Sequence, residues 1–418
     1  MFVNVAWHSL LNRKYTVLLT LISVAISTFV LLGVEHIRHE AKESFSKTVS
    51  GMDLIIGART GQLNLLLYSV FRMGNATNNI SWESYRELAT DPKIAWTIPI
   101  SLGDSHRGYR VMGTTQDYFR HFRFGQNTSL SFAQGGPFVQ LFDVVIGAEV
   151  ARKLGYCLNE SIVLAHGLGQ ASFSVHNDKP FRVTGILRPT GTPVDQALYI
   201  SLQGMEAIHL NWKEGVKIPG KQISDHDIEK FDLTPKSITA FMVGLKSKMT
   251  TFHVQRQVNH YQKEPLLAIL PGIALTELWQ MMNMMENTLR LISILVLFSS
   301  LLGLSTMLLS SIRERQREIA VMRAIGASPF FVFLIIQTEV LLISLSGIIV
   351  AIFALVIGIF FAQPLLAENY GIFINHFVLN RETLGILGII VMGTLLLGLI
   401  PALSAYRLSL HHGLAVRS

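Results

Sequence analysis

The sequence predicts a membrane protein with four transmembrane α-helices and a large α+β domain inserted between the first and second spans. Charged residues make up only 15% of the 418 residues, whereas soluble proteins carry about 25%. Four separate segments contain no Asp, Glu, Lys or Arg over about 20 residues or more, which is the length of helix that crosses a hydrocarbon core. The long stretch 35–288 is of mixed polarity and follows the first of them.

The four uncharged segments are residues 15–34, 291–312, 340–367 and 383–406. The alternative is a soluble protein with buried core helices, but four separate runs of this length argue against it. The first run is longer than the apolar region of a signal peptide, and no small-residue cleavage site follows Val34. We therefore expect an uncleaved anchor helix.

Basic residues next to the uncharged segments predict the orientation. Arg13 and Lys14 precede the first segment, four arginines lie within 313–328, and Arg407 and Arg417 follow the last segment. Because Lys and Arg accumulate in cytoplasmic loops, both ends of the chain and the 313–328 loop should be cytoplasmic. The stretches 35–288 and 368–382 should lie outside the cytoplasm. The basic excess is thus a topology signal, and no nucleic-acid-reading motif accompanies it.

Residues 51–272 read as an α+β domain, because short strand patterns alternate with short helical patterns. Strands are predicted at 53–57, 95–101, 108–113, 142–147, 161–165, 172–176, 181–187, 197–201, 238–245 and 267–270, and helices at 82–89, 116–122, 148–154, 202–210 and 250–262. The last two strands and the helix between them form a β-α-β pattern. Residues 211–237 lack periodicity and are predicted as a loop or insert. Cys157 is the only cysteine, so the domain must rely on its own core.

The loop 313–328 carries the most informative pattern. Ile319, Met322 and Arg323 share one helical face, Gly326 can end the helix, and Pro329 can begin the next one. A plain positive-inside loop needs only Lys or Arg, whereas this segment alternates acids and bases along an apolar stripe. We therefore expect a short helix that docks a partner. The residues expected to carry that contact are Arg313, Arg315, Arg317, Glu318, Ile319, Met322, Arg323 and Gly326.

Other residues could carry function within or near the membrane. Glu339 lies inside the third apolar stretch, and an intramembrane carboxylate is a functional candidate; the structural alternative is pairing with Ser or Thr of another span. The helical pattern before the second span is rich in methionine, including Met281, Met282 and Met285. These side chains either pack adaptably between helices or form a flexible stalk surface that touches a substrate. We favour the structural alternative in both cases.

Histidines offer two candidate metal ligand sets, and we predict a metal site at neither. His36 and His39 are three residues apart on the first helix, and the other set is Asp225, His226 and Asp227. Zinc needs three or four converging ligands, which neither set supplies alone, so solvated surface histidines explain both. No metalloprotease, nucleophile-elbow or cysteine-nucleophile signature occurs, so we do not expect an enzyme.

Several segments resemble one known family, in the same order along nearly the whole chain. The segment R-E-R-Q-R-E-I-A-V-M-R-A-I-G-A-S at 313–328 is similar to the loop of FtsX-like permeases, the group that includes MacB and the lipoprotein-release permeases. Residues 7–20 resemble the start of that family's first span, and 401–407 with 413–417 resemble its end. Residues 144–155 and 181–187 resemble its periplasmic core domain. Residues 211–237 match nothing in the family pattern.

The resemblance implies the permease subunit of an ABC transporter in a bacterial inner membrane, with a MacB-type periplasmic core domain. Residues 313–328 would be the coupling helix that contacts the ATPase. No Walker motif occurs in the sequence, so ATP and Mg²⁺ would bind a separate ATPase subunit, with no cofactor in this chain. The resemblance also implies a dimer, most simply a homodimer although a heterodimer with a related permease stays open, and a periplasmic or outer-membrane partner.

Three functions fit this resemblance. The first is export or extraction of an amphiphile such as a lipoprotein, peptide or drug. The second is mechanotransmission that regulates a periplasmic partner, and the third is a part in a metal-linked (zinc) transport system.

The expected parts of the chain, in order, are 1–14 cytoplasmic amphipathic lead, 15–50 first transmembrane helix and stalk, 51–272 periplasmic core domain, 273–312 stalk and second transmembrane helix, 313–328 coupling helix, 329–361 third transmembrane helix, 362–382 short periplasmic loop, 383–406 fourth transmembrane helix, and 407–418 cytoplasmic tail.

Overall fold

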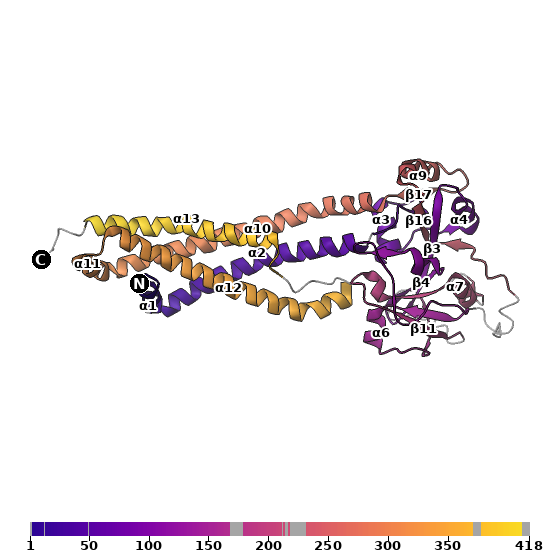
Figure 1. The fold of residues 1–418 in the computed structure, drawn as a ribbon, viewed down its shortest axis with the longest axis horizontal. Coiled ribbons are helices and arrows are strands. Elements are labelled where there is room, and N and C mark those ends of the chain that lie inside the picture. The colour runs from indigo at the N-terminus through magenta and orange to yellow at the C-terminus, as the bar shows by residue number, and fades with distance from the viewer. Residues whose placement is uncertain are drawn as a thin grey trace. The chain divides into compact units, whose positions relative to one another are not determined.

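The chain divides into two compact units in the computed structural model, which describes residues 2–11, 13–48, 50–167, 179–210, 212–213, 216–217, 231–370 and 378–411 (Figure 1). The helical unit comprises Met1–Ala41, Asn283–Glu368 and Ile374–Ser418. The α+β unit comprises Lys42–Met282 and Asn369–Phe373. The divisions fall within three long helices, α2, α10 and α12, so each of these helices contributes residues to both units.

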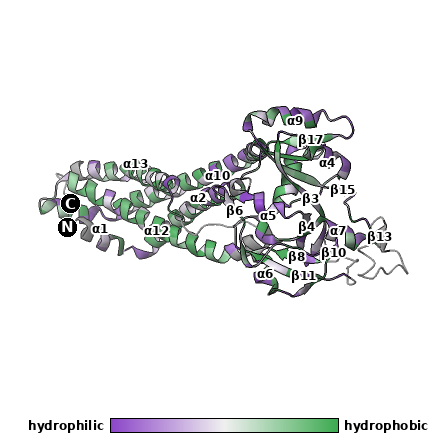
Figure 2. Cartoon of the chain, turned by 45° about the vertical axis from the view of Figure 1, so that its right-hand side comes forward, coloured by the Kyte–Doolittle hydropathy of each residue, from purple (hydrophilic) through white to green (hydrophobic). Residues whose placement is uncertain are grey.

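The helical unit is built from the helices α1 Phe2–Leu11, α2 Lys14–Thr48, α10 Pro271–Glu314, α11 Gln316–Ala324, α12 Pro329–Tyr370 and α13 Arg381–His411. Four of them contain stretches long and apolar enough to cross a membrane: Lys14–Glu43, Pro271–Glu314, Pro329–Gln363 and Arg381–Arg407. Figure 2 shows their hydrophobic character. The four membrane-span candidates predicted from the uncharged segments are thereby confirmed.

Small and hydroxylated residues bring these helices together. Ser23 of α2 lies 3.1 Å from Ser300 of α10 between hydroxyl oxygens, and Ser344 of α12 lies 3.1 Å from Thr394 of α13. A Cβ at Gly347 would lie 2.9 Å from Val24, so α12 and α2 approach closely at this glycine. This mode of packing is typical of helices in lipid, where apolar burial gives no preference for protein over acyl chains.

The α+β unit contains an 11-stranded mixed sheet with the order β17-β1-β16-β3-β4-β12-β8-β11-β7, to which β9 and β10 add at β11 and β3. Its strands are β1 Leu54–Ala58, β3 Ile94–His106, β4 Tyr109–Thr114, β7 Phe132–Gly135, β8 Asp143–Ile146, β9 Ser161–Ile162, β10 Ala165–His166, β11 Phe181–Leu187, β12 Ala197–Ser201, β16 Ala240–Leu245 and β17 Leu266–Ile269. Three short ladders join β2 Ile80–Ser81 to β15 Ser237–Ile238, β5 Arg123–Phe124 to β6 Thr128–Ser129, and β13 Trp212–Lys213 to β14 Val216–Lys217.

Alternating side chains of the strands fill separate cores on the two faces of the sheet. In β16, Met242 faces a core closed by α3 Gln62–Leu66, the π-helical turn Leu67–Phe71 and α5 Asp117–His121. Phe241 and Val243 face the opposite side, where α4 Trp82–Ala89 and α9 Thr251–Asn259 cover one half of the sheet. The helix α7 Leu202–His209, with α6 Ala148–Leu154, covers the other half.

The predicted β-α-β pattern near the end of this unit is confirmed. The strands β16 and β17 both pair antiparallel with β1, so they run parallel to each other with α9 as their connection. The other predicted helices and strands also form, except that the predicted strand 161–165 is divided into β9 and β10 and that 172–176 lies outside the described residues. Most of the predicted loop 211–237 also lies outside them, but β13 and β14 form a short ladder within it. The sequence prediction missed α3, the turn that follows it, β7, and the short strands β2, β5, β6 and β15.

Gly147 precedes α6 and supports a first prediction. A Cβ at this position would lie 2.3 Å from the carbonyl oxygen of Asp195 and 2.6 Å from that of Val194, and backbone cannot yield as a side chain can. Gly147→Ala should therefore lower the free energy of unfolding of the α+β unit by about 1–3 kcal/mol. Thermal unfolding in detergent would measure this.

Gly136 provides a matched control, because a Cβ there would meet no atom within 4 Å. Gly136→Ala should leave the unfolding midpoint unchanged. Equal midpoints for the two alanine variants would contradict the close approach at Gly147.

Candidate functional site

The helix α11 is short and has defined ends. It starts after Arg315, where the backbone departs from helical geometry at the end of α10. At its other end, the amide of Gly326 donates to the carbonyl of Arg323 (3.1 Å), and the amide of Ala327 donates to the carbonyl of Met322 (2.9 Å). Together with a φ of +100° at Gly326, these bonds form a Schellman cap, which favours glycine. The predicted short helix with a glycine stop is confirmed, and Pro329 begins α12.

One face of α11 packs against its own bundle. Ile319 is only 6% exposed and lies in a cluster with Ile312 of α10, Val332 of α12 and Ala402 of α13. Met322 is half-buried against the same cluster. The apolar stripe identified from the sequence therefore faces inward. Ile319 is therefore too buried to contact a partner, contrary to the expectation for this residue, whereas Met322 remains partly exposed.

The opposite face of α11 carries a different apolar pair. Val321 is 61% exposed and Ile325 is 80% exposed, and the exposed side chains Arg317 and Glu318 flank them. We call these four residues the outer face of α11. Residues 318, 321 and 325 follow helical spacing, so the sequence contained the signal for this face. Both faces of α11 are apolar, and only the packed structure distinguishes them.

Next to α11, Glu339 of α12 is nearly fully buried, and three side chains contact its carboxylate. The Ser9 hydroxyl of α1 donates to its Oε1 (2.5 Å), Arg315 Nη1 donates to the same oxygen (2.9 Å), and Arg13 Nη2 lies 3.6 Å from Oε2. The predicted serine contact is present, but it comes from α1 instead of another span. The two arginines were not predicted to reach Glu339.

Arg315 links this buried cluster to the outer face of α11. Its Nε donates to Glu318 (2.7 Å) while Nη1 reaches Glu339. Burial lowers the pKa of Arg315, but the carboxylates of Glu339 and Glu318 outweigh this and raise the pKa, so the guanidinium stays charged. Arg315 thus connects α11 to α12 through charged hydrogen bonds, and Ser9 connects α1 to the same carboxylate of Glu339.

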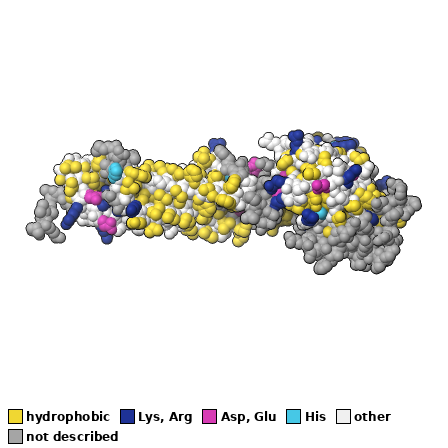
Figure 3. All heavy atoms as spheres, turned by 90° about the horizontal axis from the view of Figure 1, so that it is seen from below, with side chains coloured by type: hydrophobic (Ala, Val, Ile, Leu, Met, Phe, Trp, Pro, Cys, Tyr) yellow, Lys and Arg dark blue, Asp and Glu magenta, His cyan; other side chains and the backbone are white. Residues whose placement is uncertain are grey.

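Charged side chains gather at the end of the helical unit that holds α1 and α11, while its flanks are mostly hydrophobic (left of Figure 3). The remaining predicted contact residues lie at this end. Arg313 is exposed, and Arg323 is half-buried and donates to the carbonyl of Ala327 (2.9 Å). The structure therefore places most of the predicted polar contact residues on or beside α11.

Further along α2, the structure corrects the interpretation of the histidines. His36 is 1% exposed, so it is a buried residue and not a solvated one. His39 Nδ1 lies 3.5 Å from the carboxylate of Glu382 in α13. Bundle packing around α2 accounts for both positions. Asp225, His226 and Asp227 lie outside the described residues.

The methionines of α10 also differ from expectation. Met281 is 66% exposed and Met285 is 59% exposed, whereas Met282 is half-buried. Packing between helices of this chain therefore does not explain Met281 and Met285, because their side chains are mostly exposed.

Among the described residues, four helices long and apolar enough to cross a membrane, together with a large α+β unit, indicate a multi-pass membrane protein. The chain belongs to the ABC transporter permeases of the FtsX-like, MacB-type family: residues 16–261 match the MacB-like periplasmic core domain, and residues 290–411 match the FtsX-like permease C-terminal domain. Such domains are typical of transporter membrane subunits without a catalytic site of their own.

Among solved structures, the chain is similar to the extracellular domain of the noncanonic ABC-type transporter YknZ from Gram-positive bacteria. The two are 11% identical, the match covers 52% of this chain and 98% of that one, and the TM-score is 0.30. No curated protein sequence matches the chain.

Proposed function

We propose that this chain is the membrane subunit of an ABC transporter that works with a separate ATPase, and that α11 is the helix that docks on it. The outer face of α11 carries this proposal. Val321 and Ile325 expose apolar side chains beside Arg317 and Glu318, which is the composition of a small docking surface with an apolar centre and a charged rim. The family of the chain supports it, because ABC permeases act with an ATPase that binds ATP and Mg²⁺.

In the proposed topology, both ends of the chain and α11 are cytoplasmic. The α+β unit would then be inserted between the first and second spans, on the periplasmic side of a bacterial inner membrane. Basic flanks support this orientation. Cys157, the only cysteine, is exposed in the α+β unit and can report on it. A membrane-impermeant maleimide should label Cys157 in intact cells, and labelling only after lysis would contradict the topology.

The proposed mechanism is mechanical transmission. Closure of the ATPase pair moves α11, and the Arg315–Glu339 contact passes that movement to α1 and α12. The helices α2 and α10 contain 35 and 44 residues, well above the roughly 20 that cross a bilayer, so they can carry displacement beyond the membrane. Two ATP sites at a closing ATPase pair favour two copies of this chain.

For the substrate, the proposal is export or extraction of an amphiphile, such as a lipoprotein, peptide or drug, from the periplasmic side. The buried carboxylate of Glu339 supports a route outside the bundle. Since Arg315 and Arg13 already neutralise it, Glu339 does not offer a charged binding point for a polar substrate within the helices.

Affinity purification from native membranes in mild detergent, with a trapped nucleotide, tests the proposal. Mass spectrometry should find a stoichiometric Walker-motif ATPase, and any periplasmic or lipoprotein companion would indicate the substrate class. If no ATPase is retained under these conditions, the docking function of α11 is wrong.

A further inference from the structure

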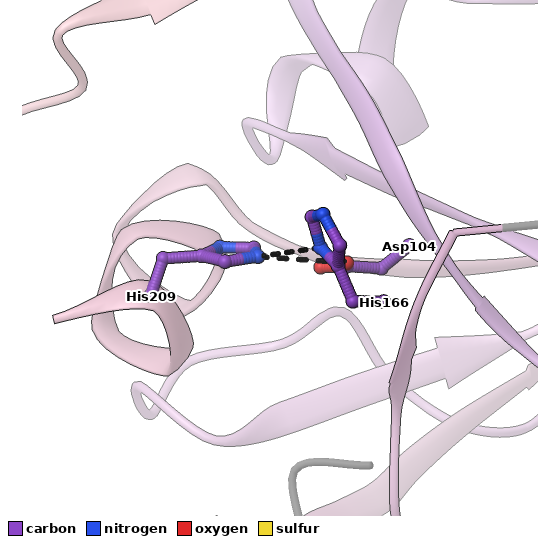
Figure 4. Close-up of side chains that lie close together, drawn as sticks. All are labelled: Asp104, His166 and His209. Carbon is purple, nitrogen blue, oxygen red and sulfur yellow. Dashed lines mark hydrogen bonds and ion pairs between the residues drawn. The ribbon is translucent and has the colours of Figure 1, made fainter. Parts of the chain in front are cut away.

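Three side chains that can ligate a metal ion converge in the α+β unit (Figure 4). Asp104 Oδ1 lies 3.0 Å from His166 Nδ1 and 3.5 Å from His209 Nε2, and the two ring nitrogens lie 3.2 Å apart. Asp104 is 1% exposed, whereas the histidine side chains are partly exposed. The three atoms form a nearly equilateral triangle.

The strands β3 and β10 and the helix α7 position the three side chains of this triangle. The strand β10 pairs with β3 so that His166 lies directly opposite Asp104. The ladder between β3 and β4 shifts register between Leu102 and Ser105, so Asp104 lies in a bulge, which is a common way to redirect a side chain. His209 is the last residue of α7 and reaches the same point from the neighbouring helix.

A backbone contact determines which ring nitrogen of His209 points into the triangle. His209 Nδ1 lies 2.8 Å from the carbonyl oxygen of Met205 and must donate to it, because a carbonyl only accepts. When Nδ1 carries the proton, Nε2 is the ring nitrogen of His209 that can ligate a metal, and it is the nitrogen that faces Asp104 Oδ1 and His166 Nδ1.

The local electrostatics favour a cation at this point, because the buried carboxylate of Asp104 lies beside both ring nitrogens. The backbone contact to Met205 is also the kind of support that orients a metal-bound histidine and fixes its tautomer.

We propose that Asp104 Oδ1, His166 Nδ1 and His209 Nε2 bind a divalent transition-metal ion of the Zn²⁺ class. Metal–ligand bonds of about 2.0–2.1 Å in a tetrahedron require ligand atoms about 3.3–3.4 Å apart, close to the three separations observed. Two imidazoles and one carboxylate are a common ligand set for such ions, with the remaining position open to water. This site is independent of the proposed docking function of α11.

A pocket adjoins the cluster at Asp104. This pocket has a volume of about 330 Å³, and its lining includes Asp104 and Gly167, the residue after His166, with Asn75, Asn79 and Arg110. Bound metal would tie β3, β10 and α7 together, so it should raise the unfolding temperature of the protein.

Titration of the full-length, chelator-treated protein in detergent, purified without a polyhistidine tag, tests the site. Calorimetry with Zn²⁺ should give one ion per chain, and Co²⁺ should give visible absorption bands that report its coordination geometry. Because loss of a supporting outer residue already weakens metal binding about 10–100-fold, loss of a ligand in His209→Ala or His166→Ala should weaken it by about 100-fold or more.

His260→Ala is the matched control. Its Nδ1 lies 2.9 Å from the carbonyl oxygen of Arg256, as His209 does with Met205, but His260 belongs to no ligand group found among the described residues. This variant should bind Zn²⁺ like the wild type. Asp104→Asn and His166→Gln keep side-chain size and test the site if an alanine variant does not fold. Wild-type affinity in His166→Gln and His209→Ala, or no Zn²⁺ uptake by the wild type, would overturn the proposal.

Discussion

Glu339→Gln should destabilise the helical unit by about 3–5 kcal/mol, the usual loss when one partner of a buried ion pair is removed. The substitution keeps the shape of the side chain but leaves the charges of Arg315 and Arg13 beside a neutral amide. Because Glu339 is 1% exposed, water cannot readily replace the missing carboxylate. Equilibrium unfolding in mixed detergent micelles would measure the change.

A double-mutant cycle separates the ion pair from other effects of Glu339→Gln. Arg315→Gln alone should also destabilise the unit, and the double variant should be less destabilised than the sum of the two. Glu314→Gln, which changes an exposed acid next to Arg315, is the control and should have little effect. Additive losses in the double variant would show that Arg315 and Glu339 do not depend on each other.

Replacing both Val321 and Ile325 with aspartate should abolish binding of the ATPase. Each apolar side chain at the centre of a docking surface can contribute about 2 kcal/mol, or roughly 30-fold in affinity. A transient complex that loses both contributions should no longer be detected. Glu318→Lys should act in the same direction, because it reverses a charge on the outer face and removes the Arg315 contact. Co-purification of the ATPase would measure both variants.

Met249→Asp controls for the general effect of placing an acid on an exposed apolar position. Met249 is 92% exposed in the α+β unit, so the change should affect neither membrane insertion nor ATPase binding. Retention of the ATPase by the Val321/Ile325 variant at wild-type yield would contradict the docking role of this face.

Much of the fold could be predicted because its signals are local. Four uncharged runs are enough to identify the membrane-crossing helices, and alternating residues in segments such as 238–245 identify the strands. The end of α11 was predictable from Gly326, since a left-handed residue at a helix end favours glycine. The signal for each of these elements lies within one continuous stretch of the sequence.

The docking surface and the metal cluster depend on packing that the sequence does not display. Both Ile319 and Val321 fit a helical apolar pattern, and only the position of α12 and α13 shows that Ile319 is the buried one. Likewise, His166 is 62 residues from Asp104 and 43 from His209, and no spacing rule connects them. A bulge in β3 and the end of α7 bring these side chains together.

Site-specific photo-crosslinking tests whether the outer face of α11 docks on an ATPase. A photoreactive amino acid is placed at Val321 on the outer face of α11 and, as a matched control, at Ile319 on the buried face of the same helix. In native membranes, position 321 should crosslink to a Walker-motif ATPase, and position 319 should give only internal products or none. If position 321 yields no crosslink to an ATPase while the protein is inserted and folded, α11 is not the docking helix and the proposed coupling mechanism is wrong.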